Sequence, residues 1–126
     1  MMRIILPWGP SINDYYGYTY TGRFYLHERV HKFRKDVAKI TDEFRAHDAL
    51  VYYDCPMAML IELFPPSKRR YDVDNRTKGV FDALEHAGVY PDDMLVRDCR
   101  QIKRHKVKFG KIIVTITELT KLQEVI

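Results

Sequence analysis

Apolar positions in the first half of the chain predict one short strand, a long loop and one amphipathic helix. Residues 3–6 form an apolar run that Pro7 ends, because proline cannot donate to a β-ladder. Residues 8–25 are rich in Gly, Asn, Ser and Tyr, which predicts a long loop. The helix is predicted from about His27 to His47, where apolar residues recur at steps of three and four: Val30, Phe33, Val37, Ile40 and Phe44.

The second half predicts a strand, a shorter helix and two further strands. Met57–Phe64 is an apolar strand that Pro65 and Pro66 end. The second helix follows residues 72–75, with Asp74 or Asn75 as its N-cap and Gly88 at its left-handed C-terminal cap. Its apolar stripe consists of Val80, Phe81, Leu84 and Ala87.

The last two strands are predicted as partners. Residues 95–107 form a strand rich in Arg and Lys, Gly110 marks a hairpin turn, and Lys111–Glu118 is the partner strand. The order β-α-β-α-β-β predicts an α+β fold, in which one mixed sheet carries two helices. We expect a single domain over residues 1–126, because the chain shows no internal repeat or linker-like stretch.

Composition narrows the function without deciding it. The net charge of +4 and the pI near 9.1 favour a polyanionic partner. No apolar run approaches the roughly 20 residues of a membrane span, and no signal peptide precedes the first strand, so we expect a cytoplasmic protein without membrane contact. Cys55 and Cys99 stand alone, without zinc-site or disulfide spacing, and are interpreted as reduced packing residues.

The candidate chemistry lies just before the second helix. Asp72 and Asp74 are two apart, so in extended backbone both carboxylates point to the same side. Such a pair is costly without a cation, and an oxygen-only set favours Mg²⁺, with Mn²⁺ also suitable, over zinc. Lys78 lies one helical turn beyond Asp74, and Asn75 adds an amide oxygen or a cap. Two acids and a lysine fit phosphoryl chemistry.

Ordinary structural interpretations compete with each of these signals. Asp and Asn before a helix are the commonest N-caps, and acidic residues such as Asp92 and Asp93 after a proline are common turn formers.

Two groups of residues are candidates for contact with DNA. The tyrosines of the first loop, Tyr15 and Tyr16 among them, could stack on bases or pack the loop against the body. Basic residues of the last strands could line one face of the sheet and follow a phosphate backbone, or could protect a solvated edge from aggregation. The candidate basic contacts are Lys68, Arg69, Arg70, Arg76, Arg97, Arg100, Lys103 and Arg104.

Taken together, these segments resemble the RusA family of Holliday junction resolvases, small enzymes that cut four-way DNA junctions. The resemblance begins at residues 6–13, with Leu-Pro-Trp-Gly-Pro-Ser followed by Asn13, and is densest over 69–98. There, residues 70–75 (Arg-Tyr-Asp-Val-Asp-Asn), Lys78, the helix 80–84 and the Asp92-Asp93 pair follow the family pattern in order and spacing. Tyr71 departs from it, because an arginine often precedes the first aspartate.

The resemblance implies a specific site and partner. Asp72, Asp74 and Asp93 take the positions of the metal-binding catalytic aspartates, with Asp92 as the adjacent alternative to Asp93. Lys78 takes the position of the catalytic lysine, and Asn75 supports the site. The resemblance further implies a RusA-like homodimer that binds branched DNA and one or two Mg²⁺ ions, makes paired symmetric nicks in recombination and repair, and uses no small-molecule cofactor.

Two other classes of function remain as alternatives. One is a basic α+β module that binds branched or single-stranded nucleic acid without cutting it, which carboxylates facing a phosphate argue against. The other is a metal-dependent phosphatase or other hydrolase of small molecules, which the absence of a phosphate-cradling glycine loop argues against.

Overall fold

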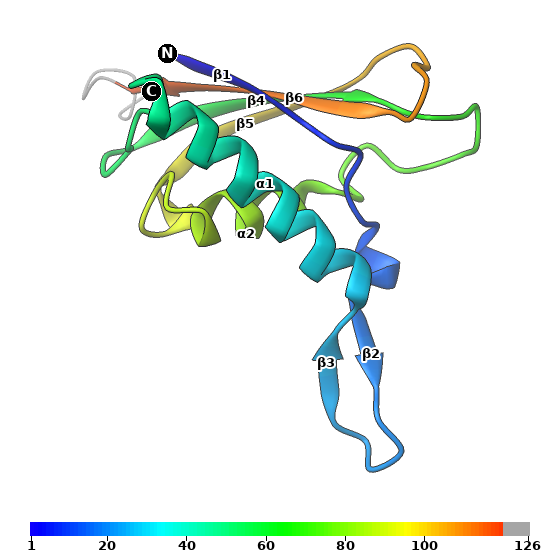
Figure 1. Ribbon diagram of the computed structural model, residues 1–126. Helices are drawn as coiled ribbons and strands as arrows, with labels where there is room; N and C mark the ends of the chain where they lie inside the picture. The colour runs from blue at the N-terminus through cyan, green and yellow to red at the C-terminus, as the bar shows by residue number, and fades with distance from the viewer. Residues whose placement is uncertain (120–126) are drawn as a thin grey trace.

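The structure, a computed structural model, describes residues 1–119 and has two layers, one sheet and two helices (Figure 1). The predicted domain of residues 1–126 extends into residues 120–126, which lie outside the described part. The sheet strands are β1 (Met2–Leu6), β4 (Met57–Phe64), β5 (Val96–Lys103) and β6 (Lys111–Glu118), and the helices are α1 (Glu28–Ala46) and α2 (Thr77–His86). The predicted α+β class with a mixed sheet is therefore confirmed.

Both helices pack on the same side of the sheet, and the core lies between the two layers (Figure 1). Alternate residues of β4 are buried, because they point toward the helices, and α2 buries Val80, Ala83 and Leu84. Within the described residues, no helix has both the length and the apolar character needed to cross a bilayer.

The sheet order is β1-β6-β4-β5, and β4 pairs with β5 in parallel and with β6 antiparallel. The predicted hairpin of the last two strands is therefore wrong, because β4 lies between β5 and β6. The residue at the turn was placed correctly, since Gly110 has a φ of 69° in the connection between them. β4 is the most apolar strand, so two neighbouring strands protect it better than a place at the sheet edge would.

The predicted first loop is only partly a loop. Residues 12–14 form a 3-10 turn, and β2 (Tyr16–Tyr18) pairs antiparallel with β3 (Phe24–Leu26) in a hairpin that projects from the body (Figure 1). The hairpin has no buried face to produce an alternating pattern, because Tyr18 and Phe24 are both about two-thirds exposed. The sequence pattern therefore gave no strand signal.

The second helix begins later than predicted. Its N-cap is Arg76, which makes no capping hydrogen bond with its side chain, so neither Asp74 nor Asn75 serves as the cap. The predicted end is confirmed, since Gly88 has a φ of 82°, the left-handed conformation that glycine adopts without strain.

Candidate functional site

Asp72 and Asp74 lie in an exposed turn between β4 and α2. The Asn75 N–H donates to the Asp72 carbonyl at 3.2 Å and the Thr77 N–H to the Asp74 carbonyl at 3.3 Å, so the segment is not the extended backbone that the sequence suggested. Neither carboxylate hydrogen-bonds or ion-pairs with another described residue. Both are therefore free to take a ligand from solvent.

Asn75 fixes this turn to the first loop. Its side-chain oxygen accepts from the Ser11 hydroxyl at 3.1 Å and from the Ile12 N–H at 3.2 Å, and its backbone carbonyl accepts from the same N–H at 2.9 Å. Asn75 is thus a structural link between two segments that are far apart in the sequence.

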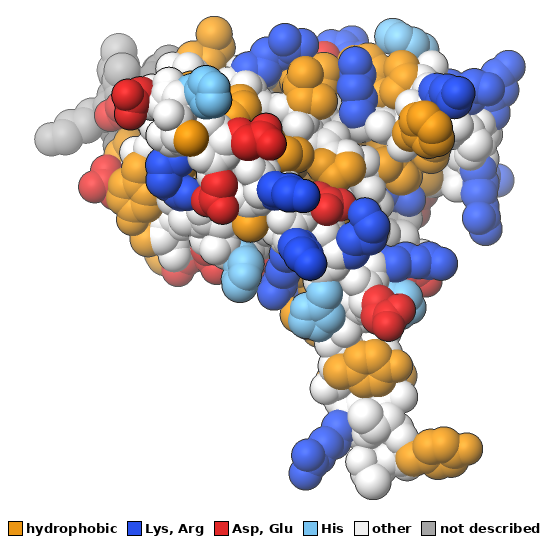
Figure 2. Space-filling view, viewed as in Figure 1, with side chains coloured by type: hydrophobic (Ala, Val, Ile, Leu, Met, Phe, Trp, Pro, Cys, Tyr) orange, Lys and Arg blue, Asp and Glu red, His pale blue; other side chains and the backbone are white. Residues whose placement is uncertain are grey.

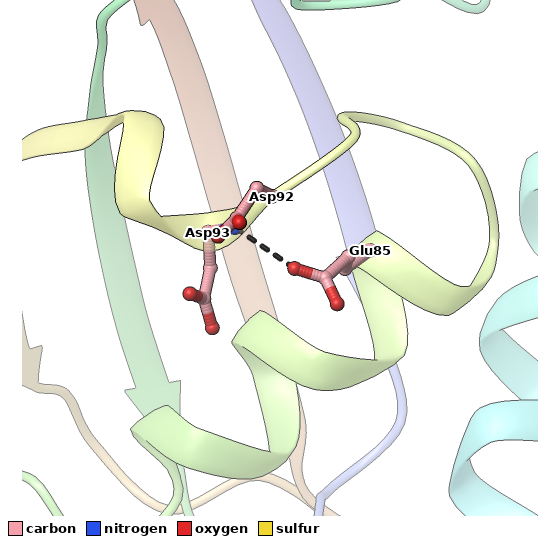
Figure 3. A group of neighbouring side chains, drawn as sticks. All are labelled: Glu85, Asp92 and Asp93. Atoms are coloured by element: carbon pink, nitrogen blue, oxygen red, sulfur yellow. Dashed lines mark hydrogen bonds between the residues drawn. The ribbon is translucent and has the colours of Figure 1, made fainter.

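A second acidic group lies where α2 ends and β5 begins. Carboxylate oxygens of Glu85, Asp92 and Asp93 lie within 4.8 Å of one another. Figure 3 shows Glu85 reaching from α2 toward the Asp92–Asp93 segment, where it accepts the Asp93 N–H at 2.9 Å. The Asp92 side chain is engaged in capping, since it accepts from the Met94 N–H at 2.9 Å, whereas the Asp93 carboxylate has no hydrogen-bond partner among the described residues.

The structure does not gather all three predicted metal ligands. Among the described residues, the group formed by Glu85, Asp92 and Asp93 is the one acidic set within 4.8 Å, and it contains neither Asp72 nor Asp74. The sequence argument placed Asp93 beside the start of α2, but its backbone is bound by the last turn. The eight steps along the helix from Thr77 to Glu85 give a rise of about 12 Å, which separates Glu85 from the start of α2.

Negative charge is concentrated around Asp93. Partial burial raises the pKa of this carboxyl, and the nearby Glu85, Asp82 and Asp92 raise it further, while Lys78 lowers it. The positive charge of Lys78, in the first turn of α2, therefore favours the ionised form of the Asp93 carboxyl. An added cation would relieve the repulsion among these acids.

Lys78 itself is held by Asp82, which the sequence analysis did not single out. The Lys78 ammonium lies 3.1 Å from Asp82 Oδ2, and this hydrogen bond raises the pKa of Lys78 above its usual range. The signal was present in the sequence, because Lys78, Asp82 and Glu85 follow one another at steps of four and three and so share one helical face.

Two of the residues predicted to contact DNA, Tyr15 and Arg76, are instead packed against the rest of the protein. Tyr15 is 1% exposed, and its hydroxyl donates to Asp82, so its ring is not available to stack on bases. Arg76 is half-buried, stacks 4.3 Å from the Trp8 ring centroid and donates to the Gly9 carbonyl at 3.0 Å. Both residues instead fix the first loop to the body.

The predicted basic face is divided. Arg100 pairs with Leu60 and Lys103 with Leu63 in β4, and positions three apart point to opposite sides of a sheet. Lys103 donates to the Tyr71 carbonyl, so this lysine is already engaged.

Lys and Arg side chains gather instead at the end of the molecule where Figure 1 places the loops after β4 and β5 (Figure 2). The exposed basic residues of these two loops are Lys68, Arg69, Arg70, Arg104, Lys106 and Lys108. Arg104 also ion-pairs with Glu62 at 2.9 Å.

A cavity of about 460 Å³ adjoins the Asp72–Asp74 turn. Its wall is partly aromatic, from Trp8 and Tyr71, and partly cationic, from Arg69 and Arg70. The Tyr71 hydroxyl is buried without a hydrogen-bond partner among the described residues, as is one terminal nitrogen of Arg76.

The donors present fit a hard divalent cation. The group of Glu85, Asp92 and Asp93, and separately Asp72 and Asp74, offer only oxygen atoms, and among the described residues no sulfur or imidazole ligand is grouped with Asp93. Such a set suits Mg²⁺ or Mn²⁺ and does not suit zinc.

The matching family model and the curated relatives point to the same family of nucleases. Residues 7–117 match the family described as "Endodeoxyribonuclease RusA". The chain is 40% identical over 116 residues to "Crossover junction endodeoxyribonuclease RusA" of Escherichia coli O139:H28 (strain E24377A / ETEC), a match that covers 92% of this chain and 93% of the relative. It is 38% identical, with the same coverage, to the proteins of that name from Escherichia coli (strain K12) and Enterobacteria phage 82.

We predict that Asp93→Asn stabilises the protein in chelator at neutral pH. A raised carboxyl pKa means that the folded state binds the proton more tightly than the unfolded state, so ionisation of Asp93 costs stability as pH rises through the raised pKa. The amide removes that charge and breaks no side-chain hydrogen bond with a described residue. Thermal unfolding should give a higher Tm than wild type at pH 7.5, with the difference shrinking toward pH 3.8, the ordinary pKa of the group.

Asp42→Asn is the control for this prediction, because Asp42 ion-pairs with Arg45 at 2.6 Å and does not belong to the acidic group of Glu85, Asp92 and Asp93. It should give no gain in Tm. An Asp93→Asn protein that is no more stable than wild type at pH 7.5 would show that repulsion among these carboxylates does not destabilise the metal-free protein.

Proposed function

We propose, starting from the fact that this chain belongs to the RusA family of endodeoxyribonucleases, that it hydrolyses DNA phosphodiester bonds at four-way junctions. The observation that carries the proposal is the match of residues 7–117 to the family, which includes every candidate acid and Lys78. Paired symmetric nicks would resolve the junction, in recombination and repair.

We further propose that Asp72, Asp74 and Asp93 hold one or two Mg²⁺ ions. The unengaged oxygens of these three side chains support the assignment, as does the crowding of negative charge around Asp93. A bound divalent ion would polarise the scissile phosphate and lower the pKa of a water molecule. Because the structure groups Asp93 with Glu85 and Asp92, and not with Asp72 or Asp74, the two acidic groups would each contribute to the metal site when DNA is bound.

Lys78 would act on the same phosphate from between the two acidic groups. Its ammonium uses one N–H toward Asp82, and two further donors remain for phosphate oxygens. A lysine ammonium is charged at neutral pH, and the hydrogen bond to Asp82 raises the pKa of Lys78 further. This charge would offset the negative charge that develops in the transition state.

The loop after β4 would hold the DNA backbone beside the acids. Lys68, Arg69 and Arg70 are exposed there, and the cavity next to them lies between this loop and the first loop. Arginines bind phosphates through paired N–H donors, so this surface favours backbone contacts over base reading.

A homodimer would account for two nicks in one junction. One chain carries one set of Asp72, Asp74 and Asp93, whereas symmetric cuts in two strands require two sites related by a two-fold axis. The partner of each chain would therefore be a second copy, with branched DNA as the shared substrate.

Asp74→Asn should abolish cutting and leave junction binding nearly unchanged. The loss in the cleavage rate should exceed about 100-fold, the upper end for residues that only support a metal ligand. Cleavage of a labelled four-way junction should require millimolar Mg²⁺ and stop in chelator. Asp54→Asn is the matched control, an exposed aspartate before β4, and should cut like wild type.

Either of two results would contradict the assignment. Normal cutting by Asp74→Asn would remove Asp74 from the site. Tight junction binding by the wild type without cutting, in Mg²⁺ and Mn²⁺ alike, would favour the alternative of a non-catalytic binding protein on the same scaffold.

Replacing Arg69 and Arg70 together by alanine should weaken junction binding and reduce its dependence on salt. Each lost phosphate contact should lower the slope of log K against log salt by about 0.9. Binding isotherms at several salt concentrations measure this. Lys35 and Lys39, exposed on α1, provide the control pair, and an equal effect of their replacement would show that only net charge matters.

Sedimentation equilibrium should give twice the 15.0 kDa mass of one chain. Mixed dimers of wild type and Asp74→Asn should then nick one strand of a junction and leave the other intact. A monomeric mass at concentrations that support cutting would exclude the dimer.

A further inference from the structure

A cluster of four side chains lies beside the candidate site and joins three elements of the fold. Asp82 of α2 is its centre, and a single oxygen, Oδ2, accepts a hydrogen bond from the Tyr15 hydroxyl and lies 3.1 Å from the Lys78 ammonium and 3.8 Å from Arg34 Nη2. Arg34 belongs to α1, and its Nη2 also donates to the Tyr15 hydroxyl at 3.2 Å. The carboxylate is thus approached from α1, from α2 and from the segment before β2.

Three members of the cluster are better shielded from water than an ordinary surface ion pair, while the side chain of Lys78 is 43% exposed. Tyr15 is 1% exposed, and the side chains of Asp82 and Arg34 are 21% and 23% exposed. Burial, followed by the hydrogen bond to Asp82, raises the pKa of Tyr15 to about 12. The neutral hydroxyl donates its hydrogen to the Asp82 carboxylate.

A second Lys–Asp pair with the same sequence spacing lies on α1 and can be compared with Lys78 and Asp82. Lys32 and Asp36 of α1 also form a pair at a spacing of four, with a distance of 2.9 Å. Lys32 is 77% exposed, and no third described side chain binds Asp36, so this pair is an ordinary exposed contact of small energy. The Lys78–Asp82 pair differs because two further side chains, one of them buried, fix the carboxylate.

Tyr15 also closes the base of the projecting hairpin. Its backbone carbonyl accepts from the His27 N–H at 3.0 Å, where Tyr15 precedes β2 and His27 follows β3. The hairpin, α1 and the lysine of α2 therefore meet at one carboxylate.

We propose that Asp82 is a positioning residue for cleavage, which acts by fixing the ammonium of Lys78 while Tyr15 and Arg34 fix Asp82. This inference rests on the proposed function, in which Lys78 contacts the scissile phosphate. A free lysine side chain loses rotamer entropy when it is immobilised. Asp82 orders the lysine side chain in the free protein, so less entropy is lost when the bound DNA reaches the transition state.

The test compares Asp82→Asn, Lys78→Ala and the double variant in single-turnover cleavage of a four-way junction. Asparagine keeps an oxygen that Tyr15 can donate to but removes the charge that holds Lys78. Asp82→Asn should slow cleavage of the bound junction about 10- to 100-fold and leave the Kd measured in chelator unchanged. The double variant should be no slower than Lys78→Ala, because Asp82 acts only through Lys78.

Asp36→Asn is the matched control, since it makes the same chemical change in a Lys–Asp pair of the same spacing. It should cut like wild type. Tyr15→Phe is the second variant, should Asp82→Asn fold poorly. It removes one hydrogen bond to the carboxylate and should slow cleavage to a smaller degree, again with no added loss when Lys78 is alanine.

The outcomes separate this inference from the proposed function. Cutting by wild type, with Asp82→Asn equally fast, would overturn the positioning role and leave the enzyme assignment intact. An equal loss from Asp82→Asn in the presence and absence of Lys78 would also overturn it, since that result marks a structural effect. If the wild-type protein does not cut any junction, the proposed function itself is contradicted.

Discussion

The parallel pairing of β4 with β5 is the constraint on which the rest of this structure depends. Parallel neighbours cannot be joined by a tight turn, so the chain must cross over, and here α2 makes the crossing. The segment before α2 carries Asp72 and Asp74, and the segment after it carries Asp93. The crossover therefore places two acidic groups at the two ends of one short helix, with Lys78 between them.

The helix that separates these groups also connects them electrostatically. Its apolar side, which includes Val80 and Leu84, packs into the core, and its charged side presents Lys78, Asp82 and Glu85. Glu85 binds the backbone of Asp93, while Asp82 binds Lys78. One helix thus combines an apolar side, whose burial fixes its orientation, with a row of charged side chains on its other side.

Much of the first loop serves to secure this arrangement. Ser11 binds Asn75, Tyr15 binds Asp82, and Trp8 packs against Arg76. Each contact joins residues more than 60 positions apart, and each reaches either the turn that carries Asp72 and Asp74 or the helix behind it. This N-terminal segment, which the sequence predicted to be a long loop, therefore supports the candidate site.

The sequence by itself determined the main apolar elements, the mixed-sheet class, the family and the candidate acids, because periodicity and motif spacing are local properties of the chain. It did not determine that β4 separates β5 from β6, since the identity of a strand's neighbour depends on which arrangement best buries the most apolar strand. It also did not show that Asp93 lies beside Glu85, at the far end of α2 from Asp74, or that Tyr15 is buried against Asp82. Those positions depend on contacts between distant segments, and only the tertiary structure brings such segments together.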